Sequence, residues 1–90
     1  MLLQSQYQEA SLQDAEPQPI EFFTAGKWVH ICAVRGERQL CQRLESMGLL
    51  PGRRVQILKW QGKGLLLKLE NTRLALRLSS AFVIDVLEVS

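Results

Sequence analysis

The stretch "RLESMGLLPGRRVQIL", residues 43–58, changes its apolar period halfway, and this change is the clearest indication of the fold. Up to Met47, apolar residues recur every three or four positions, which predicts an amphipathic helix over residues 37–47. After the change, the β-branched and apolar run predicts a strand over residues 54–60. The sequence therefore predicts a tight corner at residues 48–52, where a helix ends and a strand begins.

Leu44, Gly48 and Gly52 carry this corner as a structural motif, together with Pro51 at the turn. Leu44 lies on the apolar stripe of the helix, and Gly48 stands where the chain is expected to enter the left-handed conformation just past the helix end. Pro51 and Gly52 fit the central positions of a type II turn, because proline fixes φ of the first residue and glycine allows positive φ at the second. The interpretation is a helix stop, a tight reversal and then a strand.

The remaining segments read as strands. Residues 27–34 are β-branched and aromatic and predict the first strand, and residues 83–89 predict the last one. Residues 64–78 predict a hairpin whose two-residue turn is Asn71-Thr72, because this register places six leucines on one face and most of the charge on the other. Ser79 or Ser80 is expected to cap one short helical turn.

Five short strands with one helix between the first and second predict an all-β fold, a small antiparallel barrel. The net charge of +2 divides into −4 for residues 1–26 and +6 for residues 27–90. We expect a flexible acidic, Gln-rich arm over residues 1–22, followed by the barrel domain over residues 23–90. The arm is interpreted as a solvated tail; the alternative is that it screens the basic domain.

Several classes of function are disfavoured by composition. The sequence has one His, no GxSxG motif, no phosphate-binding Gly loop and no two carboxylates placed to share a proton, so we expect no enzyme activity. It opens with no secretory signal, and no apolar run approaches the length of about 18 residues that a membrane span needs. Two cysteines without CxxC spacing suggest free thiols in a reducing compartment. We expect a cytoplasmic protein that is not inserted in a membrane.

His30, Cys32 and Cys41 are the only candidate metal ligands that stand out. His30 and Cys32 are two positions apart on a predicted strand and therefore point to the same side, and Cys41 would complete a thiolate–imidazole site. The favoured interpretation is a packed His and two buried thiols, because free Cys is among the most buried residue types. We expect no cofactor, with weak binding of a divalent transition metal as the alternative.

Nucleic acid is a second alternative partner. Small barrels bind single strands by combining cations with aromatic stacking platforms. Trp60 is the only aromatic residue among the cations that lie on the predicted strands and turns after the helix. These seven cations are Arg53, Arg54, Lys59, Lys63, Lys68, Arg73 and Arg77. We therefore expect no nucleic-acid binding, although a nucleic-acid-binding barrel remains an alternative hypothesis.

The chain resembles the FeoA family of ferrous iron transport proteins over about residues 24–89. The family motif runs from a helix through R/K-L-x-x-x-G-L/M-x-P-G-x-x-V to L-A-L-R, an Ala-led turn and I-x-V. The matching residues here are Arg43, Leu44, Gly48, Leu49, Pro51, Gly52, Val55, Leu74 to Arg77, Ala81, Ile84 and Val86. The joint pattern is specific, whereas no single piece of it is.

This resemblance implies an SH3-like barrel that serves as a non-enzymatic cytosolic accessory of an FeoB-type transporter, a membrane protein with a GTP-hydrolysing domain. It also implies a likeness to the C-terminal domain of DtxR-type repressors, so a metal-sensing domain is a further alternative. Family members often carry a longer loop with a Gly-x-Pro element between the second and third strands, where this chain has only "QGKG", residues 61–64.

The corner is the candidate partner-binding site. Leu49 and Leu50 would be presented on a backbone stiffened by Pro51, beside Arg53 and Arg54. A pre-organised loop loses little entropy on binding, and Arg pairs well with carboxylates of a partner. The alternative is that one or both leucines pack inward as the hydrophobic contact of the helix end.

Overall fold

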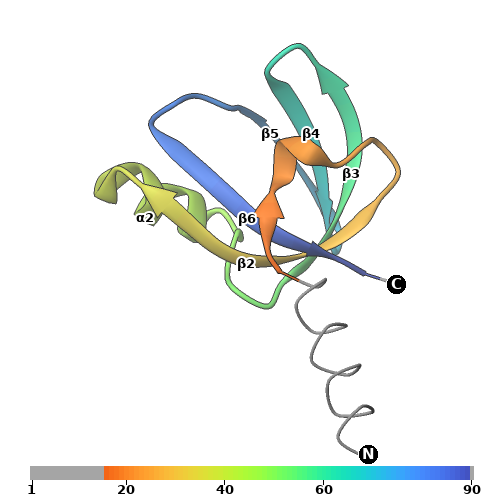
Figure 1. The fold of residues 1–90 in the computed structure, drawn as a ribbon, viewed down its shortest axis with the longest axis horizontal. Helices are drawn as coiled ribbons and strands as arrows, with labels where there is room; N and C mark the ends of the chain where they lie inside the picture. The colour runs from red at the N-terminus through yellow and green to blue at the C-terminus, as the bar shows by residue number, and fades with distance from the viewer. Residues whose placement is uncertain (1–15, 90) are drawn as a thin grey trace, which may run out of the picture.

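The computed structural model describes residues 16–89. It contains one six-stranded antiparallel sheet with strand order β1-β6-β2-β3-β4-β5, a 3₁₀ turn and one α-helix (Figure 1). The elements in chain order are β1 (Gln18–Pro19), η1 (Ile20–Phe22), β2 (Trp28–Gly36), α2 (Arg38–Ser46), β3 (Arg54–Gln61), β4 (Gly64–Leu69), β5 (Thr72–Arg77) and β6 (Phe82–Glu88). The five predicted strands and the helix between the first two are all confirmed.

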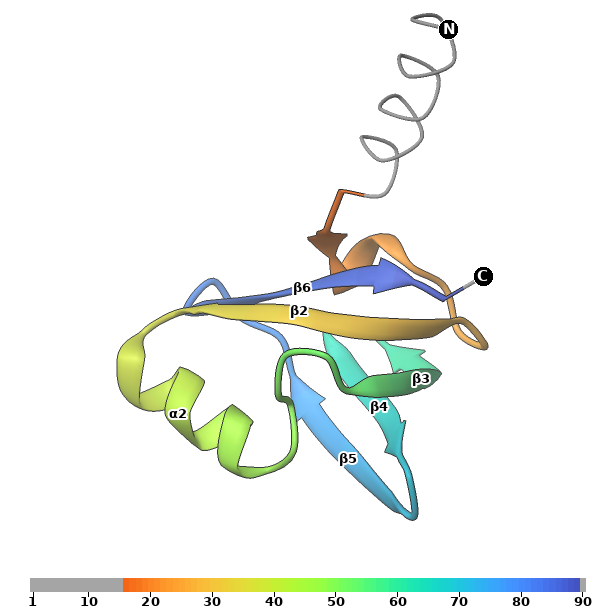
Figure 2. The same ribbon diagram turned by 90° about the horizontal axis from the view of Figure 1, so that it is seen from below.

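The sheet is β-rich and SH3-like, as predicted, but it has six strands and does not close into a barrel. β2 and β6 run side by side, and α2 and the β3–β4–β5 part lie on the same side of this pair (Figure 2). β1 pairs with the outer edge of β6, and β5 forms the other end of the sheet. The additional strand was missed because it is only two residues long and contains a proline.

The core lies inside the curl of this sheet. In β3, β4 and β6, buried residues alternate with exposed or half-buried ones, as a sheet with one face turned to the core requires. Leu44 of α2 and Leu49 of the corner join the strand residues in one cluster. Its members are Ile20, Val29, Ile31, Leu44, Leu49, Val55, Ile57, Leu65, Leu67, Leu69, Phe82, Ile84 and Val86.

The domain begins earlier than predicted. Gln18 pairs with Val86 of β6, and the side chain of Ile20 is fully buried in the core. The predicted boundary at residue 23 is therefore wrong, because one apolar side chain in a polar segment is enough to anchor it when it fills a core position. The rest of the predicted arm, residues 1–15, lies outside the described residues.

The register of the β4–β5 hairpin also differs from the prediction. Leu69 pairs with Thr72, so the turn is formed by Glu70 and Asn71, with φ of Glu70 at +41°, and not by Asn71-Thr72. Each β4 residue consequently faces a β5 residue two positions earlier than predicted. A shift of two positions leaves every side chain on its predicted face, so the leucine face was still correctly identified.

The end of β2 packs closely against the turn before β6. Gly36 has φ of +139°, and a Cβ atom there would lie 2.2 Å from the carbonyl oxygen of Ala81. Glycine is therefore required by both conformation and space. In this turn the backbone N–H of Ala81 donates to the hydroxyl of Ser79 at 3.2 Å, and a plain turn replaces the predicted helical one.

Candidate docking site

The end of α2 is fixed by a complete Schellman motif. The N–H of Gly48 donates to the carbonyl of Glu45 at 2.9 Å, and the N–H of Leu49 donates to that of Leu44 at 3.2 Å. Gly48 itself has φ of +111°, the left-handed region that the sequence predicted for this position. The chain therefore leaves the helix in one defined direction.

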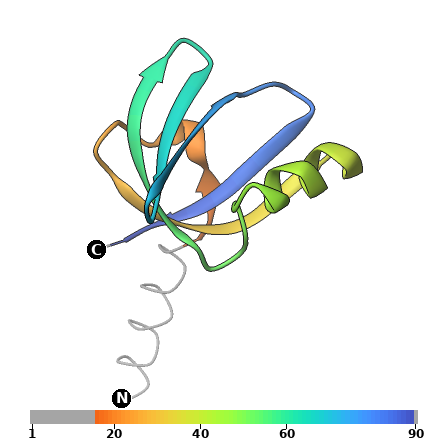
Figure 3. The same cartoon turned by 180° about the vertical axis from the view of Figure 1, so that it is seen from behind.

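The chain reversal after the helix is stabilised by a hydrogen bond within the turn and by hydrogen bonds to β2. The N–H of Arg53 donates to the carbonyl of Leu50 at 3.0 Å, and Gly52 has φ of +88°, which together confirm the type II turn centred on Pro51-Gly52. Two further backbone hydrogen bonds join this turn to Ile31 of β2. The N–H of Gly52 donates to the carbonyl of Ile31 at 2.7 Å, and the N–H of Ile31 donates to the carbonyl of Arg53 at 2.8 Å. The corner consequently lies directly against β2 (Figures 1 and 3).

The two leucines of the corner have opposite environments. Leu49 is fully buried in the core, whereas the side chain of Leu50 is 42% exposed. Leu49 is therefore a packing residue that a partner cannot reach, which corrects its assignment as a contact residue. Met47, just before the reversal, is 41% exposed, so the corner presents two large apolar side chains to solvent. We call residues 47–54 the corner surface.

The two arginines of the corner surface also differ. Arg53 Nη1 donates to Glu70 Oε1 at 2.9 Å and joins the corner to the β4–β5 turn. Arg54 is exposed, and its guanidinium lies 4.6 Å from the centroid of the Trp28 ring. Among residues 16–89, Arg54 makes no ion pair. The structure thus brings Leu50, Pro51 and Arg54 together as accessible groups, with Arg53 engaged within the protein.

The candidate metal ligands are not assembled into a site. His30 is exposed, which corrects the expectation of a packed His, and the two cysteines are half-buried free thiols. Within the described part of the chain, no group of three or more His, Cys, Asp and Glu side chains is placed to hold a metal ion. Burial raises the pKa of the Cys32 thiol, and the nearby carboxylate of Asp85 raises it further.

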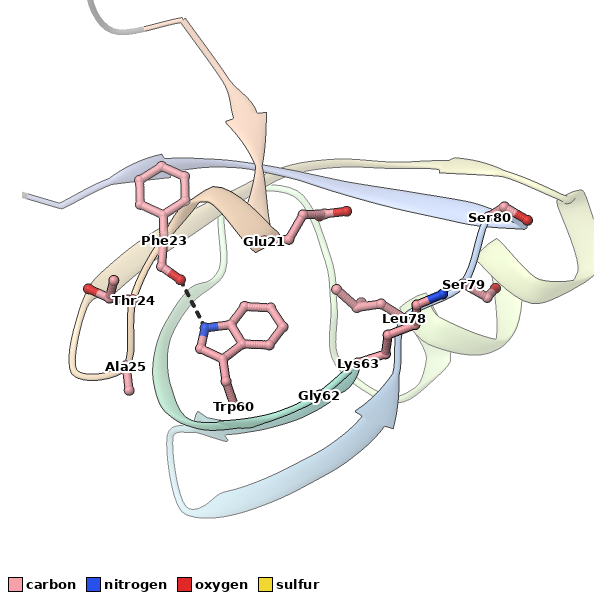
Figure 4. Close-up of a pocket in the computed structure, with 10 residues that line it drawn as sticks. All are labelled: Glu21, Phe23, Thr24, Ala25, Trp60, Gly62, Lys63, Leu78, Ser79 and Ser80. Carbon is pink, nitrogen blue, oxygen red and sulfur yellow. Dashed lines mark hydrogen bonds between the residues drawn. The ribbon is translucent and has the colours of Figure 1, made fainter.

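One feature of the surface was not found by sequence reasoning. A pocket of about 740 Å³ opens beside Trp60, whose indole Nε1 donates to the carbonyl of Phe23 at 2.9 Å (Figure 4). The pocket is lined by three segments far apart in the sequence: Glu21, Phe23, Thr24, Ala25, Trp60, Gly62, Lys63, Leu78, Ser79 and Ser80. The only sequence signal for it was a tryptophan, Trp60, between the polar residues Lys59 and Gln61.

Comparisons with known proteins support the resemblance noted from the motif. Among residues 16–89, no helix has the length and apolar character needed to cross a membrane. Neither the curated proteins nor the solved structures contain a match to this chain. The FeoA domain family, however, matches residues 19–87, which includes the helix, the corner and all strands from β2 to β6 except the last residue of β6. This protein therefore belongs to the FeoA family, which indicates a role related to ferrous iron transport.

Proposed function

We propose that this protein is a non-enzymatic cytoplasmic accessory that binds the cytosolic region of an FeoB-type membrane transporter through the corner surface. The observation that carries the proposal is the exposure of Leu50 and Met47, 42% and 41%, on a backbone fixed by the Schellman motif and the type II turn. Neighbouring large apolar side chains that are exposed to solvent on a fixed backbone are typical of protein-binding sites. Membership of the FeoA family supports this kind of role.

The energetics favour an apolar anchor with a charged rim. Because the hydrogen bonds to Ile31 already hold the turn, little conformational entropy remains to be lost on binding. Truncation of a central apolar anchor usually costs about 2 kcal/mol or more, whereas removal of a rim charge costs about 1 kcal/mol or less. Leu50 is the anchor in this proposal, and Arg54 is the rim charge.

The test is surface plasmon resonance with the immobilised cytosolic region of an FeoB-type transporter. Leu50→Asp is expected to weaken binding about 30-fold, mainly through faster dissociation, since 1.4 kcal/mol corresponds to a factor of about ten. Arg54→Glu is expected to slow association and to change its salt dependence. Phe22→Asp is the matched control, because Phe22 is 69% exposed and lies outside the corner surface.

Melting curves of all variants establish that they are folded. The proposal would be contradicted if Leu50→Asp bound like the wild type while Phe22→Asp weakened binding. It would also fail if Lys63→Glu, at the rim of the Trp60 pocket, abolished binding and Leu50→Asp did not. In that case the partner would bind at the pocket, and the corner would serve only to connect α2 to β3.

A further inference from the structure

The outward side of β3, β4 and β5 carries a group of cations that the docking proposal does not use. Strand pairing fixes which residues share this side: Gln56 pairs with Lys68 and Lys68 with Arg73, while Leu66 pairs with Lys59 and with Ala75. Gly64 pairs with Gln61 and with Arg77 in the next row. We call this side, with the four cations Lys59, Lys68, Arg73 and Arg77, the cationic face.

These four cations are exposed, and the nine positions of the three rows contain no acidic residue. The ion pairs in the described part of the chain use other cations, namely Lys27, Arg35 and Arg53. Lys68 and Arg73 stand directly opposite each other, an arrangement of like charges that destabilises a sheet. An anionic partner laid over the cationic face would remove this repulsion.

The layout of the face favours an extended anionic surface. The central row contains Lys59, the half-buried Leu66 and the exposed Ala75, and the other three cations lie in the rows on either side, so apolar groups lie between the charges. Anionic membranes attract such clusters of Lys and Arg, each contributing about fivefold to binding when it lies near the lipid headgroups. We propose that the cationic face binds the anionic lipid surface of a membrane, which goes beyond docking through the corner surface and does not depend on it.

Single-stranded nucleic acid fits the same face less well. Binding of single strands relies on aromatic rings that are open for stacking with bases. The row of Gln56, Lys68 and Arg73 continues into β2 at Trp28, which pairs with Gln56, and the guanidinium of Arg54 already lies over the Trp28 ring. The cationic face proper, from β3 to β5, has no aromatic side chain on its outward positions.

The test is co-sedimentation of the full chain with vesicles, without any transporter present. Vesicles of phosphatidylcholine and phosphatidylglycerol in equal amounts are compared with vesicles of phosphatidylcholine alone. We expect binding only to the anionic vesicles, and we expect it to decrease with added salt. The double variant Lys68→Gln/Arg73→Gln should lower the partition coefficient about 25-fold, as the product of two factors of about five.

The matched control is Arg38→Gln/Arg43→Gln, which makes the same change of net charge at two exposed positions of α2. It is expected to stay within about threefold of the wild type, because the removed charges lie off the cationic face. Equal loss in both double variants, or no preference for anionic vesicles, would overturn the proposal. So would binding of a fluorescent single-stranded oligonucleotide that Lys68→Gln/Arg73→Gln abolishes while vesicle binding is absent.

Discussion

Replacement of Gly48 by Ala measures how strongly the corner is constrained. A non-Gly residue at φ of +111° costs about 2 kcal/mol of backbone strain. The new Cβ would lie 2.8 Å from Cδ2 of Leu69, a buried side chain that would have to leave its rotamer at a cost of about 1 kcal/mol. The reduced freedom of the unfolded chain offsets roughly 0.5–1 kcal/mol. Gly48→Ala should therefore destabilise the protein by about 2 kcal/mol.

For a domain of this size, about 2 kcal/mol corresponds to a decrease in Tm of about 10 °C. The assay is thermal and urea unfolding followed by circular dichroism. Gly52→Ala is the matched control, since Gly52 also has positive φ, +88°, but nothing lies within 4 Å of the place that a new Cβ would take. Gly52→Ala should cost about 1 kcal/mol. A Tm for Gly48→Ala within 2–3 °C of the wild type, roughly the resolution of such a comparison, would refute the reasoning.

Three further changes test other parts of the structure. Ile20→Ala should destabilise the domain by about 2–4 kcal/mol in urea unfolding, because Ile20 is fully buried. An unchanged free energy of unfolding would support the predicted domain boundary at residue 23 instead. Trp60→Phe should cost about 1 kcal/mol in the same assay, since the Phe23 carbonyl loses its donor. Because burial raises the pKa of Cys32 in the folded state, the free energy of unfolding should fall as pH rises through that pKa, and Cys32→Ser should reduce this fall; an unchanged pH profile would contradict it.

Local rules were sufficient where backbone conformation depends on one or two residues. Gly48 and the Pro51-Gly52 pair each demand a particular φ, so the helix end and the type II turn were predicted at the correct positions. The hairpin register was predicted less well, because the alternating pattern fixes which face a leucine occupies but not which residue it meets. Neither Asn71-Thr72 nor Glu70-Asn71 is a strong turn former, and packing therefore decided between them.

Features that depend on distant segments were not predictable in the same way. The short strand β1 and the burial of Ile20 depend on the free edge of β6, more than sixty residues away in the chain. The Trp60 pocket is lined by three separate segments of the chain, so no local sequence pattern predicts it. At the corner, the sequence placed both Leu49 and Leu50 at the right location, but only the three-dimensional packing shows that Leu49 faces the core and Leu50 faces solvent.

The most direct test of the docking proposal is an NMR titration of the ¹⁵N-labelled full chain with the cytosolic region of an FeoB-type transporter. The proposal predicts that the largest amide shift changes and line broadening occur at residues 47–54, with smaller changes at Trp28, over which Arg54 lies. Changes confined to the pocket segments, residues 21–25, 60–63 and 78–80, would contradict it. A spectrum that does not change at saturating concentrations of the partner would contradict it as well.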